Sequence, residues 1–306
     1  MTWYPLALPP QAGHRFLVTG ANAGVGFFTA AKLAAAGAHV VLAGRSAERL
    51  SAATSAIRSV RPAASVESLV IDVSSQRSVH AGADRLLAQA PLHGIVANAG
   101  MVHTPKAREL SVDGDELVLA TNVLGHFTLV GRLLPHLALG ARIVSLGSLS
   151  TLLSTFRIDD LQLERGYDSW RAYAQSKIAT QVFAFELDRR LRAAGVAVSS
   201  VVAHPGYSIR GRTPTVPGVN EPSRGDRFAD ALQGAWAQGK HRGAEVSLHA
   251  LTAAEVTGGQ FWGPRHLTRG EPALQHPSRV TTNPAIGARF WTIAEETTGR
   301  AFPVGG

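Results

Sequence analysis

Tyr173 and Lys177 stand four residues apart in "YAQSK", a spacing that can create an acid–base catalyst. On a helix, residues four apart share a face, so the phenol and the ammonium would lie side by side. A tyrosine has an ordinary pKa of about 10 and transfers protons poorly near neutral pH. A neighbouring ammonium favours the phenolate, so we expect Lys177 to lower the pKa of Tyr173. Such a motif also occurs by chance, and its meaning depends on the rest of the chain.

A glycine-rich segment, "LVTGANAGVGF" at residues 17–27, follows a short apolar run. Between a strand and a helix, Gly20, Gly24 and Gly26 would let the backbone approach a pyrophosphate, whose charge the helix N-terminus favours. The spacing is GxxxGxG and not the GxGxxG of the dinucleotide fingerprint. A purely structural turn is therefore the alternative to a nucleotide cradle.

The next expected strand ends in "LAGRS", with Arg45 at the position where NAD-binding folds carry an acidic residue for the ribose 2′-hydroxyl. A carboxylate would repel a 2′-phosphate, whereas a guanidinium can bind it through two hydrogen bonds. The sequence therefore favours NADP(H) over NAD(H). The alternative is that Arg45 is a solvated charge at a helix start.

Apolar runs alternate with alanine-rich helical stretches through the first two thirds of the chain. The expected strands cover 14–20, 38–45, 65–73, 93–100, 141–148 and 196–206, and the expected helices 27–37, 46–60, 76–89, about 110–137 and about 170–194. The strands are almost continuously apolar, as in a parallel sheet with both faces covered. This order predicts an α/β fold, a single-domain Rossmann-like doubly wound parallel sheet with helices on both faces.

The character of the chain changes after Gly206. The segment 207–227 is rich in Pro, Gly and Arg and too long for an ordinary connection, so we expect a substrate lid there, with a disordered linker as the alternative. We expect one domain, 1–306, with an N-terminal extension at 1–13, a last edge strand at 260–264, a C-terminal extension at 265–306 and a terminal helix at 284–298.

Composition narrows the possible functions. The absence of cysteine excludes thiol nucleophiles and Cys-ligated zinc and fits a reducing cytoplasm, where we expect the protein. The net charge of +8 raises nucleic acid as a partner, but Lys and Arg are spread along the chain with acidic neighbours, so we expect none. No histidine pattern suggests a metal site. We also expect neither a signal peptide nor a membrane span.

The glycine cradle, "NAG" at 98–100, Asn122, Ser148 and the Tyr173–Lys177 pair together resemble the short-chain dehydrogenase/reductase superfamily, over about residues 14–206. Ser148 and Tyr173 are 25 positions apart, roughly double the usual distance in that superfamily. The intervening stretch resembles the branch of retinol dehydrogenases and light-dependent protochlorophyllide reductase, which also favours NADP. A light-driven reductase would need an active-site cysteine, which this chain lacks.

The resemblance implies a catalytic set of four residues. Tyr173 would be the acid–base, and Ser148 would hydrogen-bond the substrate oxygen. Lys177 would lower the Tyr173 pKa and hold the nicotinamide ribose, and Asn122 would hold a water linking Lys177 to a proton relay. The implied cofactor residues are Gly20, Asn22, Gly24, Val25, Gly26, Arg45, Asp72, Val73, Asn98, Ala99, Gly100, Tyr173, Lys177, Pro205, Gly206 and Ser208.

Within that cofactor set, Asp72 and Val73 would lie near the adenine, residues 98–100 under the ribose, and Pro205 and Gly206 over the nicotinamide.

Two features depart from the family pattern. Three serines compete for the catalytic role: Ser145, Ser148 and Ser150. Where the family often has a threonine for the carboxamide, this chain has Arg210, so Ser208 or backbone serves instead, or the contact is missing. Arg210 and Arg212 either meet an anionic substrate group or are solvated loop charges.

We therefore expect an NADP(H)-dependent oxidoreductase that interconverts a ketone or aldehyde and an alcohol on a mostly apolar small molecule, with Tyr173 as acid/base. The alternative is a non-catalytic NADP(H)-sensing regulator, although such proteins commonly lose the Tyr or the Lys. By analogy alone, a homodimer or homotetramer would form through the helices at 110–137 and 170–194.

Overall fold

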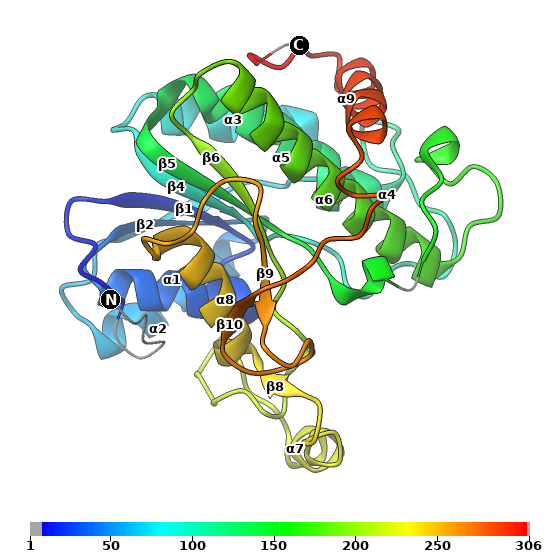
Figure 1. Ribbon diagram of the computed structural model, residues 1–306. Coiled ribbons are helices and arrows are strands. Elements are labelled where there is room, and N and C mark those ends of the chain that lie inside the picture. Colours follow the sequence, from blue (N-terminus) through cyan, green and yellow to red (C-terminus); the bar gives the residue numbers. More distant parts are fainter. Residues whose placement is uncertain (1–7, 153, 305–306) are drawn as a thin grey trace.

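The computed structural model describes residues 8–152 and 154–304 and shows a twisted sheet between two layers of helices (Figure 1). The sheet has eight strands in the order β10-β9-β6-β5-β4-β1-β2-β3, all parallel except β10. The strands are β1 Arg15–Thr19, β2 His39–Gly44, β3 Val66–Val70, β4 Leu92–Ala97, β5 Leu137–Leu146, β6 Ser199–Ala203, β9 Phe261–Pro264 and β10 Pro272–Leu274, with a separate short pair β7 Ser208–Ile209 and β8 Gln238–Gly239. The predicted fold class is confirmed.

The two helical layers bury separate apolar cores. One core joins the sheet to α3, α5, α6 and α9, and the other joins it to α1, α2 and α8. The helices are α1 Gly24–Ala35, α2 Ala47–Val60, α3 Gln76–Leu87, α4 Leu117–Leu119, α5 Gly125–Leu133, α6 Ser169–Ala193, α7 Arg224–Ala231, α8 Lys240–Thr252 and α9 Pro284–Thr298. Short 3₁₀ turns lie at Leu134–His136, Leu149–Leu152 and Ile158–Asp160.

The alternation of side chains along a strand explains why the strands are apolar throughout. Every residue of β1 is buried, and two consecutive residues of this strand, Leu17 and Val18, pack in the two opposite cores. Since β1, β2, β4, β5 and β6 run in parallel, their carboxyl ends meet at one edge of the sheet. Loops at this edge of a doubly wound sheet are where ligands bind.

The predicted helix over about 110–137 is wrong at its start and is not continuous. The carboxylate of Glu116 accepts hydrogen bonds from the backbone of Val118 and Leu119 at 2.9 and 2.7 Å, so the helix begins at Leu117. A π-helical turn, Ala120–Leu124, separates α4 from α5. Strand β5 then begins at Leu137, before the predicted start at 141.

The part of the chain after β6 differs most from expectation. The segment 207–227 contains β7 and the start of α7, and α8 was not predicted at all. Residues 243–251 of α8 are all buried, including Glu245, so the helix shows no apolar stripe in the sequence. Strand β9 is not the edge strand, because β10 pairs with it in antiparallel fashion. The predicted extensions at 1–13 and 265–306 lie partly outside the described residues.

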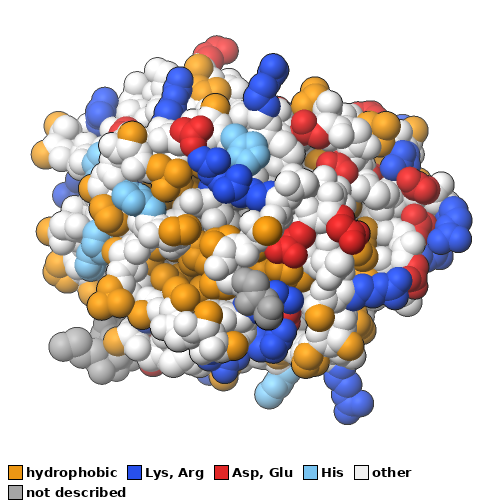
Figure 2. All heavy atoms as spheres, turned by 90° about the horizontal axis from the view of Figure 1, so that it is seen from above, with side chains coloured by type: hydrophobic (Ala, Val, Ile, Leu, Met, Phe, Trp, Pro, Cys, Tyr) orange, Lys and Arg blue, Asp and Glu red, His pale blue; other side chains and the backbone are white. Residues whose placement is uncertain are grey.

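One helical stretch, Leu117–His136, has the length and mean hydropathy, 1.5, of a membrane-spanning segment. However, 83% of that window is buried inside the protein, as in the core helix of many globular proteins. The expectation of no membrane span stays a prediction. Figure 2 shows one face of the molecule, on which Lys and Arg side chains are scattered among acidic ones and not gathered in a single patch.

Candidate active site

A cleft of about 930 Å³ opens at the carboxyl ends of the strands. It is lined by most of the residues that the sequence predicted: Gly20, Asn22, Gly24, Val25, Arg45, Asp72, Val73, Asn98, Ala99, Gly100, Ser148, Tyr173, Lys177, Pro205, Gly206 and Ser208. Gly26 and Asn122 do not line the cleft. Residues separated by almost two hundred positions in the sequence therefore converge on one cavity.

The glycine cradle is held so tightly that side chains are excluded. A Cβ on Gly26 would lie 2.5 Å from the Gly20 carbonyl oxygen and would also clash with the Asn98 amide. The Asn98 amide donates hydrogen bonds to the carbonyls of Thr19 and Gly20 at 2.7 and 3.3 Å. Asn98 thus fastens the cradle to the end of β4 with its side chain.

Thr19 connects the same two strands and was missed by the sequence analysis. Its hydroxyl oxygen accepts from the backbone of Asn98 and Ala99, both at 2.9 Å. His126 lies 2.9 Å from the same hydroxyl, and burial lowers the pKa of His126 to about 4, so the ring is neutral at pH 7. A threonine that ends an apolar strand carries no signal of this role.

Lys240 is a second residue that the sequence analysis missed. Its Nζ lies 3.8 Å from the position that a Cβ on Gly24 would take, beside the N-terminus of α1. Burial, followed by the nearby Arg210, lowers the pKa of Lys240, and no carboxylate of the described residues is within ion-pair distance. An ammonium beside a helix N-terminus is favourable only with an anion between them, which fits a pyrophosphate.

The side chains that could transfer a proton meet at the inner end of the cleft. The Tyr173 hydroxyl donates to Ser148 Oγ at 3.2 Å. The hydroxyls of Ser145 and Ser150 are buried and have no partner among the described residues. Of the three serines that the sequence offered, Ser148 is therefore the one that contacts Tyr173.

Lys177 lies one turn after Tyr173 on α6, as the spacing predicted, and it is buried. Its Nζ donates to the Leu146 carbonyl at 2.8 Å, and burial lowers its pKa to about 8. Burial raises the pKa of Tyr173, and the Ser148 hydrogen bond only partly opposes this. The expected lowering of the Tyr173 pKa by Lys177 is thus wrong in direction for this arrangement, because desolvation of the phenolate dominates.

Asn122 lies in the π-helical turn, and its side chain is fully engaged. Its Oδ1 accepts from the Met101 backbone at 2.7 Å, and its Nδ2 donates to Ser176 Oγ at 2.8 Å. The Asn122 amide therefore joins the loop after β4 to α6. Its backbone carbonyl, where the family resemblance implies a bound water, already has two protein neighbours: Thr180 Oγ1 at 3.4 Å and His126 Nδ1 at 3.3 Å.

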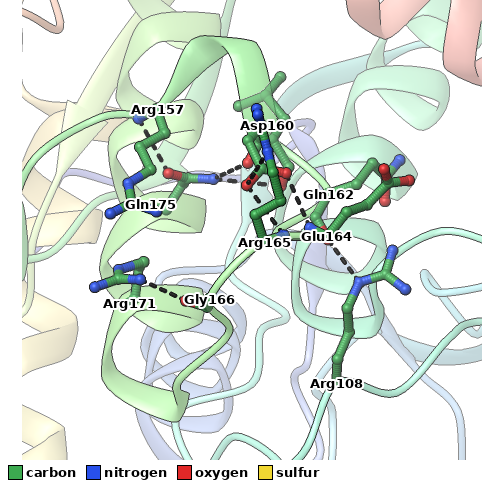
Figure 3. A network of polar contacts seen from close by, with 10 residues as sticks. Arg108, Arg157, Asp160, Gln162, Glu164, Arg165, Gly166, Arg171 and Gln175 are labelled. Atoms are coloured by element: carbon green, nitrogen blue, oxygen red, sulfur yellow. Dashed lines mark hydrogen bonds and ion pairs between the residues drawn. The ribbon is translucent and has the colours of Figure 1, made fainter.

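The long segment between Ser148 and Tyr173 is anchored by a polar network (Figure 3). Gln175 points from α6 towards this segment, accepting from the Arg157 backbone at 3.1 Å and donating to the Asp160 carbonyl at 2.8 Å. Arg108 donates to the Gln162 carbonyl at 2.8 Å from the opposite side. The extra residues thus brace the second turn of α6, where Tyr173 and Gln175 lie.

The remaining wall of the cleft is largely apolar and was not predicted. Its large apolar and aromatic side chains are Met101, Val102, Leu149, Trp170 and Tyr207. Arg210 and Arg212 do not line it: Arg210 donates to the Glu221 carbonyl at 2.8 Å, and Arg212 lines a second cavity. The described residues include no group of three His, Cys, Asp or Glu side chains that could hold a metal ion.

A doubly wound sheet with a glycine cradle and a Ser–Tyr–Lys set at its carboxyl edge defines a dinucleotide-binding α/β protein. Within that class, the family model described as short chain dehydrogenase matches residues 14–209. The chain belongs to the short-chain dehydrogenase/reductase family, and its relatives place it in a branch resembling the retinol dehydrogenases.

Two curated relatives illustrate this branch. Polyprenol dehydrogenase of Mus musculus is 40% identical over 209 residues, which cover 66% of this chain and 62% of that protein. Retinol dehydrogenase 11 of Homo sapiens is 33% identical over 292 residues, covering 94% of this chain and 86% of the relative. The match therefore spans less than two thirds of the length of the mouse protein.

A solved structure confirms the fold over almost the whole chain. An uncharacterised protein from Mycobacterium Paratuberculosis has a TM-score of 0.81 and 32% identity, covering 99% of this chain and 100% of that one. A short chain dehydrogenase from Burkholderia cenocepacia J2315, solved in complex with NADP, is similar in fold alone, with a TM-score of 0.60 and 24% identity over 81% of this chain and 97% of that one.

Proposed function

We propose that the protein is an NADP(H)-dependent oxidoreductase that interconverts a carbonyl and an alcohol on a mostly apolar substrate. The observation that carries this proposal is the 3.2 Å contact between the Tyr173 hydroxyl and Ser148 Oγ at the inner end of the cleft. Two hydroxyl donors so close together can both reach one substrate oxygen. The sensor alternative has no comparable support, because the Tyr and the Lys are both present, one turn apart on α6.

The cofactor, when bound, supplies or accepts the hydride. During reduction, negative charge grows on the carbonyl oxygen as its carbon gains the hydride. Ser148 and Tyr173 donate hydrogen bonds to that oxygen, and Tyr173 then gives it a proton, so that an alcohol and a phenolate result. Lys177, buried one helical turn away, would hold the ribose hydroxyls and is the cation that would partly offset the burial cost of the phenolate.

The cofactor side of the cleft fits a dinucleotide with a 2′-phosphate. The cradle leaves no room for a Cβ at Gly20 or Gly26, which is the close approach that a pyrophosphate requires. Arg45 and Arg49 line the cleft where β2 ends and α2 begins, and Ser46 caps that helix. Two guanidinium groups beside a helix N-terminus favour a phosphate dianion.

The substrate side of the cleft fits an apolar molecule. The wall beside Tyr173 presents Met101, Leu149 and Trp170, and the relatives are named for polyprenol and retinol, which are long-chain alcohols. We infer an apolar alcohol, or its aldehyde or ketone, as the substrate class.

The test compares Tyr173→Phe with the wild type, using NADPH oxidation against ketones, aldehydes and retinoids. Turnover should fall by about 10²–10⁴-fold while NADPH affinity changes little, because only the transferable proton is removed. Tyr167→Phe is the matched control, since the Tyr167 hydroxyl donates to the Pro105 carbonyl outside the cleft. A fully active Tyr173→Phe would refute the mechanism, and a wild type that binds NADPH without turning over any substrate would favour the sensor.

A further inference from the structure

Three large apolar side chains project into solvent from the segment 207–242, which extends beyond the predicted lid at 207–227 and is called the lid from here on. Phe228 on α7 and Leu232 and Trp236 in the following turn are 72, 70 and 52% exposed; together they are called the apolar tip. In Figure 1, α7 lies at the end of a projection that extends away from the sheet. Such exposed aromatic and aliphatic groups at one end of a molecule mark an interaction surface.

The apolar tip is held in place by specific hydrogen bonds. Ser223 and Asp226 form a reciprocal capping box at the start of α7. At its other end, Asp230 accepts from the Gly211 backbone at 2.6 Å, and Arg227 donates to Thr215 at 2.6 Å. The polar face of α7 is therefore bound to the rest of the lid, while its apolar residues are left facing outward.

Cations gather immediately behind the apolar tip. The Arg212 guanidinium packs against Gly234, within the turn between Leu232 and Trp236. A second cavity, of about 530 Å³, begins at the residue after Trp236. Its charged and histidine lining consists of Arg212, His241, Arg242, His266, Arg269 and Glu271. No ion pair joins Arg212 or Arg269 to a carboxylate of the described residues.

We propose that the apolar tip docks on a lipid bilayer that carries anionic headgroups. Phe228, Leu232 and Trp236 would insert at the headgroup level, and the guanidinium groups of Arg212 and Arg269 would meet lipid phosphates. In segments that lie in a membrane interface, aromatic and leucine side chains are likewise outermost and arginines lie behind them. A second copy of the chain fits less well, because pairing two tips would bring like charges together.

The apolar tip is connected to the cleft through Tyr207. This residue lines the cleft and is 41% exposed, and its hydroxyl donates at 2.6 Å to Gln233, which lies in the turn between Leu232 and Trp236. A docked lid would therefore offer an apolar substrate a path from the bilayer to Tyr173. This consequence rests on the proposed function, whereas binding to the bilayer does not.

Cosedimentation with vesicles tests the proposal without any enzyme assay. The cofactor-bound wild type should bind phosphatidylcholine vesicles that contain phosphatidylglycerol, and bind those of phosphatidylcholine alone far less. The variant Phe228→Ser/Leu232→Ser/Trp236→Ser should lose binding by more than about tenfold. The matched control is Val60→Ser/Val112→Ser/Leu139→Ser, which removes apolar side chains that are more exposed than those of the tip but lie outside the lid, and it should bind as the wild type does.

Charge is tested separately with Arg212→Gln/Arg269→Gln, which should lose most of the preference for anionic vesicles. Tyr173→Phe should bind vesicles normally, so failure of the proposed chemistry and failure of docking are distinguishable. The proposal is overturned if the wild type does not bind, or if the control loses as much binding as the tip variant. It is equally overturned if the tip variant changes only the oligomeric state, as measured by ultracentrifugation, since a second copy would then cover the tip.

Discussion

The glycine cradle at residues 20–26 and the lid at 207–242 both line the cleft, yet they are built in different ways. The cradle is formed by backbone lying against backbone, with positive φ angles at Gly20 and Gly24. Apart from the short pair of β7 and β8, the lid is held by side chains that reach the backbone across ten to twenty positions, as in the contact of Asp230 with Gly211. The cradle should therefore tolerate almost no substitution, whereas single changes in the lid should affect binding more than folding.

The largest effect is expected from a methyl group added to the cradle. Gly26→Ala would place a Cβ 2.5 Å from the Gly20 carbonyl, so we expect a loss of about 1–3 kcal/mol in stability and of at least about a hundredfold in NADPH affinity. Gly225→Ala, in α7, meets nothing closer than Ser223 Oγ at 3.6 Å, so it should leave NADPH affinity unchanged and should not lower stability. Chemical denaturation and NADPH titration measure stability and cofactor affinity for both variants. An equal loss of stability in the two variants would contradict the difference proposed between the cradle and the lid.

The next effect distinguishes the residue assigned to the 2′-phosphate from the residue assigned to the pyrophosphate. Arg45→Asp should weaken NADPH by about 10–100-fold and NADH hardly at all, because only NADPH carries the 2′-phosphate. Lys240→Gln should weaken both cofactors by about tenfold, because the pyrophosphate is common to both. Titration of each variant with both cofactors, with Lys240→Arg as the charge-retaining control, decides the matter. Discrimination between the cofactors by Lys240→Gln would refute the pyrophosphate assignment.

A smaller effect should follow when the brace of α6 is broken. Gln175→Leu keeps the size of the side chain but leaves the Arg157 backbone amide without its partner and the Asp160 carbonyl with only its Leu163 donor, which should cost about 1–3 kcal/mol. Turnover should fall with little change in NADPH affinity, since Tyr173 lies on the braced turn. Gln233→Leu, in the lid, is the control and should cost less than about 0.5 kcal/mol. Equal costs would mean that the lid is as tightly coupled to folding as the brace.

The smallest effect concerns pH. The pKa of Lys177 falls from 10.5 to about 8 on folding, so between these values the unfolded chain binds more protons than the folded one. Stability should therefore rise with pH across this window, by about 1 kcal/mol per pH unit, as burial of the charged lysine ceases to oppose folding. Lys177→Met should remove this slope in denaturation measured from pH 8 to pH 10. A slope that persists in the variant would assign it to another group.

The sequence alone determined the parts of the protein that depend on local backbone geometry. Apolar runs and alanine-rich stretches predicted the parallel sheet, the glycines predicted a cradle between β1 and α1, and four-residue spacing placed Tyr173 and Lys177 on one helical face. These features follow from short-range periodicity and from the conformational freedom of glycine, so neighbouring residues are enough to predict them.

Only the tertiary structure decided which distant groups meet. It brought Lys240 to the cradle, placed Thr19 between two strands, and selected Ser148 from three serines. It also reversed the expected direction of the Tyr173 pKa, because the degree of burial, which no local pattern encodes, outweighs the hydrogen bond that favours the phenolate. The reason is common to all four: long-range contacts and desolvation depend on how the whole chain packs, and spacing along the sequence contains neither.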